Sequence, residues 1–130
     1  MLKVAALVAQ ASVALGACAA APPPYEPSPM LGRYEARGQE PGWLAEMDPA
    51  RGLALTLDYG ERRLTTPPPA VEADGPGRTA YVAVAGQTPV RLVAVERPCA
   101  DVMSGRRYPH TVELQVGERR YDGCGGPVTE

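Results

Sequence analysis

Between residues 33 and 130, apolar and polar side chains alternate in short runs that are separated by turn-forming residues. The clearest runs are 53–59, where Leu53, Leu55, Leu57 and Tyr59 alternate with small or polar residues, and 111–116. A period of two residues is typical of a β-strand with one buried face. We therefore predict a half-buried strand over each run.

Two other runs, 80–85 and 90–95, are apolar on both faces. Strands covered on both sides have this composition, so we expect the two runs near the centre of the sheet. Weaker strand candidates are 43–48, 63–66 and 119–124. Turn-forming residues stand at 48–52, 59–61, 86–87 and 117–118, and we expect a longer loop from Pro67 to Gly77.

Outside the N-terminal segment, no run of ten residues has helical periodicity. Many short strands joined by turns are typical of a sandwich or a barrel. We predict an all-β fold for residues 33–130, a small antiparallel β-barrel of about eight short strands, because closure of a barrel removes exposed strand edges.

The N-terminal residues have a different pattern. The basic residue Lys3 precedes an apolar stretch from Val4 to Leu15, which is shorter than the roughly 20 residues that span a membrane and fits a signal peptide. The stretch ends in Leu-Gly-Ala-Cys at residues 15–18, which resembles the lipobox of bacterial lipoproteins. We expect residues 1–17 to be a signal peptide and Cys18 to be acylated. The alternative is an ordinary secretory signal cut within residues 17–21.

Residues 18–32 follow as a proline-rich tether, with five prolines between positions 22 and 29 that favour an extended chain. The resemblance makes the lipid bilayer the first expected partner, through acylated Cys18. No Asp follows Cys18, so we expect a lipid-anchored protein of the bacterial cell envelope, in the outer membrane and facing the periplasm.

Composition and charge exclude several classes of function. A length of 130 residues allows one domain, and a net charge of −2 lacks the basic surface that binds nucleic acid. One His and three Cys exclude a multi-histidine metal centre and leave a cysteine-rich zinc site short of ligands. We expect no metal and no cofactor.

Two cysteines, Cys99 and Cys124, remain after acylation of Cys18. In an oxidising compartment we expect them to form a disulfide, which closes a loop of about 25 residues and contributes ~3 kcal/mol of stability. The alternative, a reactive cysteine that works with His110, leaves its partner thiol exposed to oxidation.

Three sequence clusters, at residues 37–43, 99–109 and 121–125, resemble a family of bacterial envelope lipoproteins. The chain has Gly-x-Glu-Pro-x-Trp at 38–43, Cys-x-Asp-x-Met-Ser at 99–104 and a closing Gly-Cys at 123–124. The resemblance implies a small β-rich domain with a Cys99–Cys124 bridge, and no particular activity. The family often has Asn and Phe where this chain has Gln39 and Gly42, so we expect an aromatic contact to be missing.

A shorter match lies within the second cluster. Ser-Gly-Arg-Arg-Tyr at 104–108 is similar to the Ser-Gly-x-x-Tyr motif of periplasmic and membrane-bound inhibitors of c-type lysozyme. Those inhibitors insert a loop into the enzyme's cleft, where polar groups meet two catalytic carboxylates. A second inhibitor motif that supplies a lysine is absent, so Arg106 or Arg107 would provide the cationic contact.

The candidate binding residues are Glu40, Trp43, Asp101, Ser104, Arg106, Arg107 and Tyr108. Several have simpler structural roles: we expect Trp43 to fill the mouth of the barrel and Asp101 to cap a turn around Met103 and Ser104. The arginine pairs at 62–63, 106–107 and 119–120 are expected to be solvated rather than to form a cationic rim.

Asp101, Ser104 and His110 are the residue types of a hydrolytic triad, yet no nucleophile elbow surrounds Ser104, and we expect His110 to be exposed. We therefore predict no catalytic residue. The expected function is that of a non-enzymatic, lipid-anchored envelope protein with a binding or structural β module. The alternative is an inhibitor of c-type lysozyme, or of another peptidoglycan-cleaving enzyme, through residues 104–108. The protein partner is then an envelope protein or a lysozyme-like enzyme.

Overall fold

The computed structural model describes residues 9–10, 12, 16 and 32–128. The predicted signal peptide and tether, with Cys18, fall almost wholly outside these residues. Within the described part of the chain, no helix is long and apolar enough to cross a membrane. Residues 34–127 form antiparallel strands and one 3-10 turn, so the all-β prediction is confirmed.

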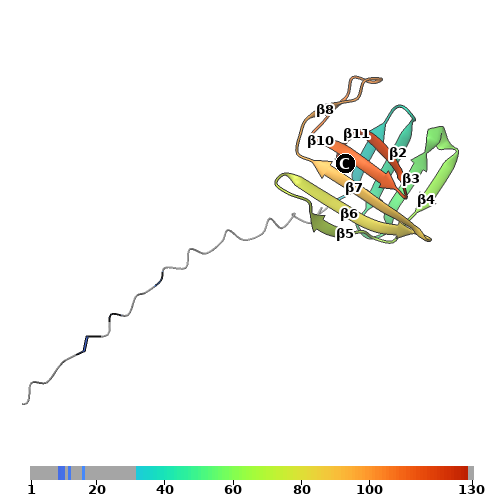
Figure 1. Ribbon diagram of the computed structural model, residues 1–130. Coiled ribbons are helices and arrows are strands. Elements are labelled where there is room, and N and C mark those ends of the chain that lie inside the picture. The colour runs from blue at the N-terminus through green and yellow to red at the C-terminus, as the bar shows by residue number, and fades with distance from the viewer. Residues whose placement is uncertain (1–8, 11, 13–15, 17–31, 129–130) are drawn as a thin grey trace, which may run out of the picture.

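One antiparallel sheet of nine strands curls into a half-barrel (Figure 1). Its order is β4 (Arg62–Thr65), β3 (Gly52–Leu57), β2 (Trp43–Asp48), β1 (Tyr34–Gly38), β11 (Arg119–Pro127), β10 (His110–Val116), β7 (Thr88–Val95), β6 (Arg78–Ala85) and β5 (Ala70–Ala73). Two further strands, β8 (Cys99–Ala100) and β9 (Arg107–Tyr108), form a separate small hairpin.

The strand count and the closure differ from the expected barrel of about eight strands. β1 was not predicted, and β5 lies inside the segment 67–77 that we expected to be a loop. β4 and β5 are the two edges of the sheet and do not pair with each other. The prolines at 67–69 lie in the connection between these two strands. A proline run cannot form the tight turn of a hairpin or donate backbone hydrogen bonds, so β4 and β5 do not pair and the barrel stays open.

The strands that we expected at the centre, β6 and β7, lie toward one edge, and β1 and β11 occupy the centre. Ala80 and Val93 nevertheless face outward and are buried, opposite each other across β6 and β7. On the same face, Arg78 and Arg91 form ion pairs with Asp74 at 3.2 Å. Arg78, Arg91 and Val93 line one small depression on this face. Because an arginine stem can cover apolar surface while its charge stays in water, a strand near an edge can have buried side chains on both faces.

The inner face of the half-barrel is filled by side chains. Its buried members come from every long strand and include Tyr34, Met47, Leu55, Leu92 and Leu114. Tyr59, which we expected to be the last inward residue of the 53–59 strand, lies instead in the 3-10 turn η1 (Asp58–Gly60) and is 76% exposed. Asp58 and Tyr59 both have positive φ, so the chain turns away before Tyr59 can point inward.

The half-barrel has two distinct ends. At the proximal end, Val128 donates a backbone hydrogen bond to Arg33, so the two ends of the described domain lie side by side. β1 runs from there to the distal end, where residues 39–42 form the turn to β2. η1 lies at the distal end as well, because the Tyr59 N–H donates to the carbonyl of Gly42 at 2.8 Å.

Candidate functional site

The three sequence clusters meet at the distal end of the sheet. The Gln39 side-chain amide donates to Asp101 Oδ1 at 3.0 Å, which joins the first cluster to the second. Cys99 and Cys124 form a disulfide with their Cα atoms 5.4 Å apart, which joins the second cluster to the third. The Trp43 indole donates to the carbonyl of Asp122 at 3.1 Å, which joins the first cluster to the third. The predicted disulfide is confirmed.

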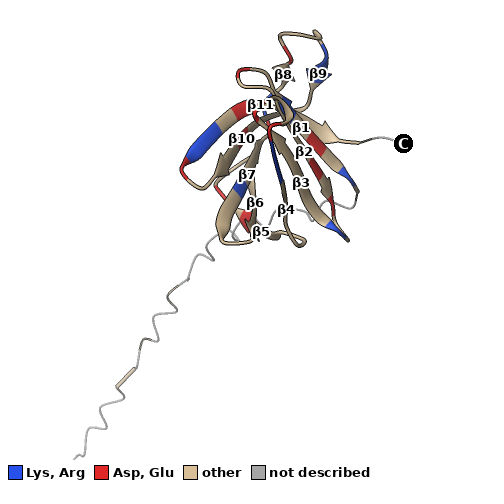
Figure 2. Ribbon diagram, turned by 90° about the vertical axis from the view of Figure 1, so that its right-hand side faces the viewer, with Lys and Arg blue, Asp and Glu red and all other residues tan. Residues whose placement is uncertain are grey.

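The segment Cys99–Tyr108, which we name the distal hairpin, packs against the outer face of β11 and extends beyond the sheet (Figures 1 and 2). Cys124 and Gly126 face outward on β11, opposite Arg37 and Glu35 of β1. A Cβ atom at Gly126 would lie 2.7 Å from Pro109, so the glycine lets the chain after the hairpin lie close to the sheet.

Asp101 organises the loop of the distal hairpin. Its Oδ2 accepts hydrogen bonds from the Ser104 backbone N–H at 3.0 Å and from the Ser104 hydroxyl at 2.6 Å. The Gly105 N–H donates to the Asp101 carbonyl at 2.7 Å. The bonds from Ser104 and Gln39 lower the pKa of the Asp101 carboxyl, because they favour its charged form. The predicted capping role of Asp101 is confirmed.

The tip of the hairpin carries two large apolar side chains that face solvent. Val102 is 86% exposed and Met103 is 76% exposed. Sequence reasoning missed both, because a local pattern does not show whether another part of the fold covers a turn. Arg106 and Arg107, also exposed, follow on the return arm, and the Arg106 guanidinium lies 5.0 Å from the centre of the Tyr108 ring.

Ser104 and Tyr108, the fixed ends of the lysozyme-inhibitor match, are used inside the hairpin. The Ser104 hydroxyl donates to Asp101 and accepts from the Arg106 N–H at 3.2 Å. The Tyr108 ring is buried, and its hydroxyl has no hydrogen-bond partner among the described residues. Of the residues in the match, Arg106 and Arg107 are the ones whose charged groups are free to meet a partner.

Trp43 and Glu40 have different surroundings. Trp43 is 5% exposed, stands edge-on to Tyr121 with ring centres 6.3 Å apart, and packs so closely on Gly38 that a Cβ there would lie 2.0 Å from its Nε1. This confirms that the indole fills the mouth of the barrel. Glu40 is exposed in the turn that contains the cis Glu40–Pro41 peptide bond.

The residues of the hydrolytic triad are not brought together. Ser104 bonds to Asp101, whereas the Nδ1 atom of His110 lies 2.9 Å from the Tyr34 hydroxyl and the two rings stack. His110 is half-buried rather than exposed as we expected, because β10 places it beside Tyr34 of the inner face. Burial lowers the pKa of His110, partly offset by the charge of Glu96. Within the described ranges no group of three His, Cys, Asp or Glu is placed to hold a metal ion.

The arginine pairs do not form one cationic rim. Arg119 pairs with Asp58 at 2.7 Å, and Arg120 pairs with Glu113 at 3.1 Å. Asp58 also accepts from the Tyr121 hydroxyl at 3.1 Å, which fixes the start of η1. The Tyr59 ring of this turn lies close to Gly42, because a Cβ at Gly42 would lie 2.8 Å from the ring.

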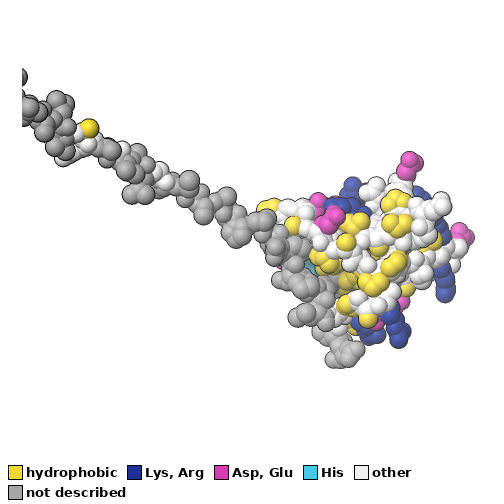
Figure 3. Space-filling view, turned by 90° about the horizontal axis from the view of Figure 1, so that it is seen from below, with side chains coloured by type: hydrophobic (Ala, Val, Ile, Leu, Met, Phe, Trp, Pro, Cys, Tyr) yellow, Lys and Arg dark blue, Asp and Glu magenta, His cyan; other side chains and the backbone are white. Residues whose placement is uncertain are grey.

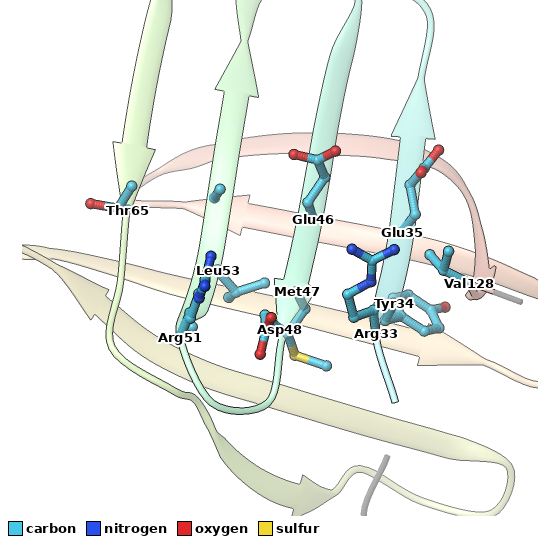
Figure 4. Close-up of a pocket in the computed structure, with 12 residues that line it drawn as sticks. Arg33, Tyr34, Glu35, Glu46, Met47, Asp48, Arg51, Leu53, Thr65 and Val128 are labelled. Carbon is cyan, nitrogen blue, oxygen red and sulfur yellow. The ribbon is translucent and has the colours of Figure 1, made fainter. Parts of the chain in front are cut away.

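The outer face of β1–β4 has two depressions. The proximal one has a volume of about 330 Å³ and is bordered by Glu35 and Glu46, which face each other across β1 and β2, and by the arginines 33 and 51 (Figure 4). The distal one, of about 450 Å³, lies beside the base of the distal hairpin and includes Arg37, Gln39, Tyr59 and Arg63. Seen from the side opposite the hairpin, the molecule shows hydrophobic side chains flanked by charged ones at its periphery (Figure 3).

No protein-family model, curated protein or solved structure matches the chain. The chemistry of the distal end is therefore inferred from its own geometry. That geometry combines a cross-linked hairpin with an apolar tip, two exposed arginines and a neighbouring groove.

Proposed function

We propose that the protein is a non-enzymatic, lipid-anchored protein of the bacterial cell envelope whose distal hairpin binds a partner protein. The single observation that supports this most is the exposure of Val102 and Met103 on a loop held by a disulfide. Exposed large apolar side chains beside arginines are typical of protein-binding surfaces. A loop that is already ordered loses little conformational entropy when it binds.

The placement of the hairpin suits an anchored protein. The tether precedes Arg33 in the sequence and therefore joins the domain at the proximal end, whereas Gln39 contacts the hairpin at the distal end. The five residues of β1 separate these ends by about 17 Å at the usual rise per residue. With Cys18 in a bilayer, the hairpin tip would face away from that bilayer.

The side chains at the tip indicate what kind of surface the partner has. Val102 and Met103 fit an apolar pocket, and a thioether side chain adapts to irregular surfaces. Arg106 and Arg107 favour carboxylates at the border of that pocket. We therefore propose a partner with an apolar depression flanked by acidic residues.

The test uses the full chain in its envelope, with a photoreactive amino acid in place of Val102. We expect one dominant cross-linked protein in the membrane fraction, and none when the same group replaces Val71, which is exposed on the edge strand β5. Cys18→Ser should leave uncleaved precursor without acyl chains and abolish the cross-link. Normal processing of Cys18→Ser would contradict the lipid anchor, and equal labelling from positions 102 and 71 would contradict the binding role.

Inhibition of c-type lysozyme, or of another peptidoglycan-cleaving enzyme, is the second candidate. The observation that favours it is that Arg106 and Arg107 are both exposed on a rigid loop, ready to pair with catalytic carboxylates. Ser104 and Tyr108 would then support the loop rather than contact the enzyme.

Titration of the purified protein against c-type lysozyme tests this candidate. We expect inhibition at micromolar protein that is lost when Arg106 and Arg107 are both changed to Gln. Arg97→Gln, which removes an exposed arginine away from the tip, is the matched control and should inhibit normally. Absence of inhibition, or inhibition that survives the double change, rules out this candidate and leaves the first proposal standing.

A further inference from the structure

The distal depression is a groove that crosses four strands on the outer face of the sheet. Arg37, Leu44, Thr56 and Arg63 are direct neighbours in the register of β1 to β4 and form its floor. At about 4.8 Å between strands, this row spans about 14 Å. We name it the outer groove. It is long and shallow, and its floor includes an apolar and a hydroxyl side chain.

An aromatic ring lies along the distal border of the groove. Tyr59 is 76% exposed although its backbone is fixed, because its N–H donates to Gly42 and the neighbouring Asp58 bonds to Arg119 and Tyr121. Asp58 and Tyr59 both occupy the left-handed region, which costs energy for residues with a Cβ. A strained turn that holds an exposed ring in one place is typical of a functional position.

The polar groups around the groove are partly unused. The Arg63 side chain is exposed and makes no ion pair or hydrogen bond among the described residues, while Arg37 pairs with Glu35. The Gln39 amide nitrogen donates to Asp101, which leaves its carbonyl oxygen available. The Nε atom of Arg37 is buried without a partner in the described structure. The groove therefore has one free cation and several separate hydrogen-bonding groups.

We propose that the outer groove binds an oligosaccharide that carries carboxylate groups. A pyranose ring presents C–H bonds on one face and hydroxyls around its rim. The electron-rich face of Tyr59 suits the C–H face, and Thr56 and Gln39 suit the hydroxyls. Arg63 pairs with a carboxylate on the sugar.

An acidic peptide fits this groove less well than a glycan. Peptides that bind to sheets either add a strand at an open edge or insert side chains into deep pockets. The outer groove crosses the face of the sheet from β1 to the edge strand β4, so a peptide strand added at that edge would lie beside Arg63 and not along the groove. Leu44 is the aliphatic residue on its floor. The binding site is separate from the tip of the distal hairpin, so the proposal of a glycan in the groove does not depend on the protein partner proposed above.

Trp43 provides a direct signal, because it is the single tryptophan of the chain and borders the groove. The experiment titrates the purified protein with two glycans of equal length and follows tryptophan fluorescence and heat of binding. One glycan alternates N-acetylglucosamine with N-acetylmuramic acid, whose lactyl group carries a carboxylate. The other contains N-acetylglucosamine alone and is neutral. We expect the carboxylated glycan to bind more tightly, by about tenfold.

Two changes at the groove test the assignment of residues. Tyr59→Asn removes the ring while keeping a residue that tolerates positive φ, and should weaken binding of both glycans by about tenfold. Tyr59→Phe keeps the ring and should bind normally. Arg63→Gln should remove the preference for the carboxylated glycan. Arg107→Gln, a matched exposed arginine on the hairpin, should change neither glycan's affinity.

The results of these titrations distinguish the proposal from its alternatives. Absence of binding to either glycan at millimolar concentration overturns the proposal, as does binding that Tyr59→Asn and Arg63→Gln both leave unchanged. A poly-glutamate peptide that binds as tightly as the carboxylated glycan, and loses affinity in Arg63→Gln, would assign the groove to acidic peptides instead. Arg63 is exposed without partners in the described structure, so its variant is expected to fold and keeps the test valid should Tyr59→Asn unfold.

Discussion

At the residue scale, the pair of His110 and Tyr34 shows how a polar group is placed beside the core. The Tyr34 hydroxyl lies 2.9 Å from the imidazole, and the rings are stacked with centres 5.7 Å apart. Gly125, opposite His110 on β11, leaves the necessary space, because a Cβ there would lie 2.8 Å from that hydroxyl. The imidazole is thus held in a site that favours its neutral form.

This site predicts a pH dependence of stability. Burial lowers the pKa of His110 in the folded state, so the unfolded state binds more protons as pH falls below about 6.5. The stabilisation from neutral His110 is complete above that pH and is lost as pH falls through the folded-state value. We expect the Tm to fall between pH 7.5 and pH 5.5, and to fall less in His110→Gln. An equal decrease in both proteins, measured by thermal unfolding, would contradict this role of His110.

Some residues reveal their role in the sequence and others do not. Asp101 followed three residues later by Ser104 predicts a capped turn because the hydrogen bonds are local, and Trp43 predicts a plug because a lone large ring is usually buried. The exposure of Val102, Met103 and Tyr59 was not predictable. It depends on whether another part of the fold covers the turn, which the local pattern does not contain.

At the element scale, the distal hairpin depends on its attachments. Its strands β8 and β9 have two residues each, too short for an independent hairpin. The disulfide to β11 and the Gln39–Asp101 hydrogen bond connect it to the sheet. The hairpin is therefore ordered by the domain, and the position of its tip depends on these two links.

Removal of the disulfide tests this dependence. Changing Cys99 and Cys124 to Ser should lower the free energy of unfolding by about 3 kcal/mol, because the reduced unfolded chain has more freedom over a loop of about 25 residues. We expect urea unfolding to show this loss, and the Ser104 amide to exchange hydrogen faster. Asp101→Ala, which keeps the bridge, should speed exchange of the same amide with a smaller loss of stability. Unchanged stability in the double serine variant would show that packing alone holds the hairpin.

Strand prediction was least complete where packing required unusual residues. The weak candidate strand 119–124 is confirmed as the first part of β11, which continues through Gly125 and Gly126, and glycines disfavour strands in general. Here the close approach of β1 demands a glycine, since a Cβ at Gly123 would lie 2.0 Å from the carbonyl oxygen of Arg37. β5 was missed because all four of its residues are exposed, so it has no alternating pattern.

At the scale of the whole molecule, the class of fold and the disulfide followed from the sequence, whereas the strand order did not. Alternation identifies strands but does not say which of them pair. Ala80 and Val93 suggested a central position for β6 and β7, whereas both are buried on the outer face near one edge, beside the ion-paired Arg78 and Arg91. The candidate site was likewise predictable in part. Its motifs were visible, but their meeting at the distal end depends on the pairing of the remote strands β1 and β11, and the outer groove depends on the register of β1 to β4.

The pairing of β1 with β11 determines when the centre of the sheet can form during synthesis. Tyr34 is aligned with Pro127 and Arg37 with Cys124, so the middle of the sheet joins the first strand of the domain to the last. Among the strands of the sheet, β11 is the last to be synthesised, and until it emerges from the ribosome β1 lacks one of its two neighbours. Contacts between such remote segments form slowly. The centre of the sheet is therefore expected to form only after every strand of the domain has been synthesised.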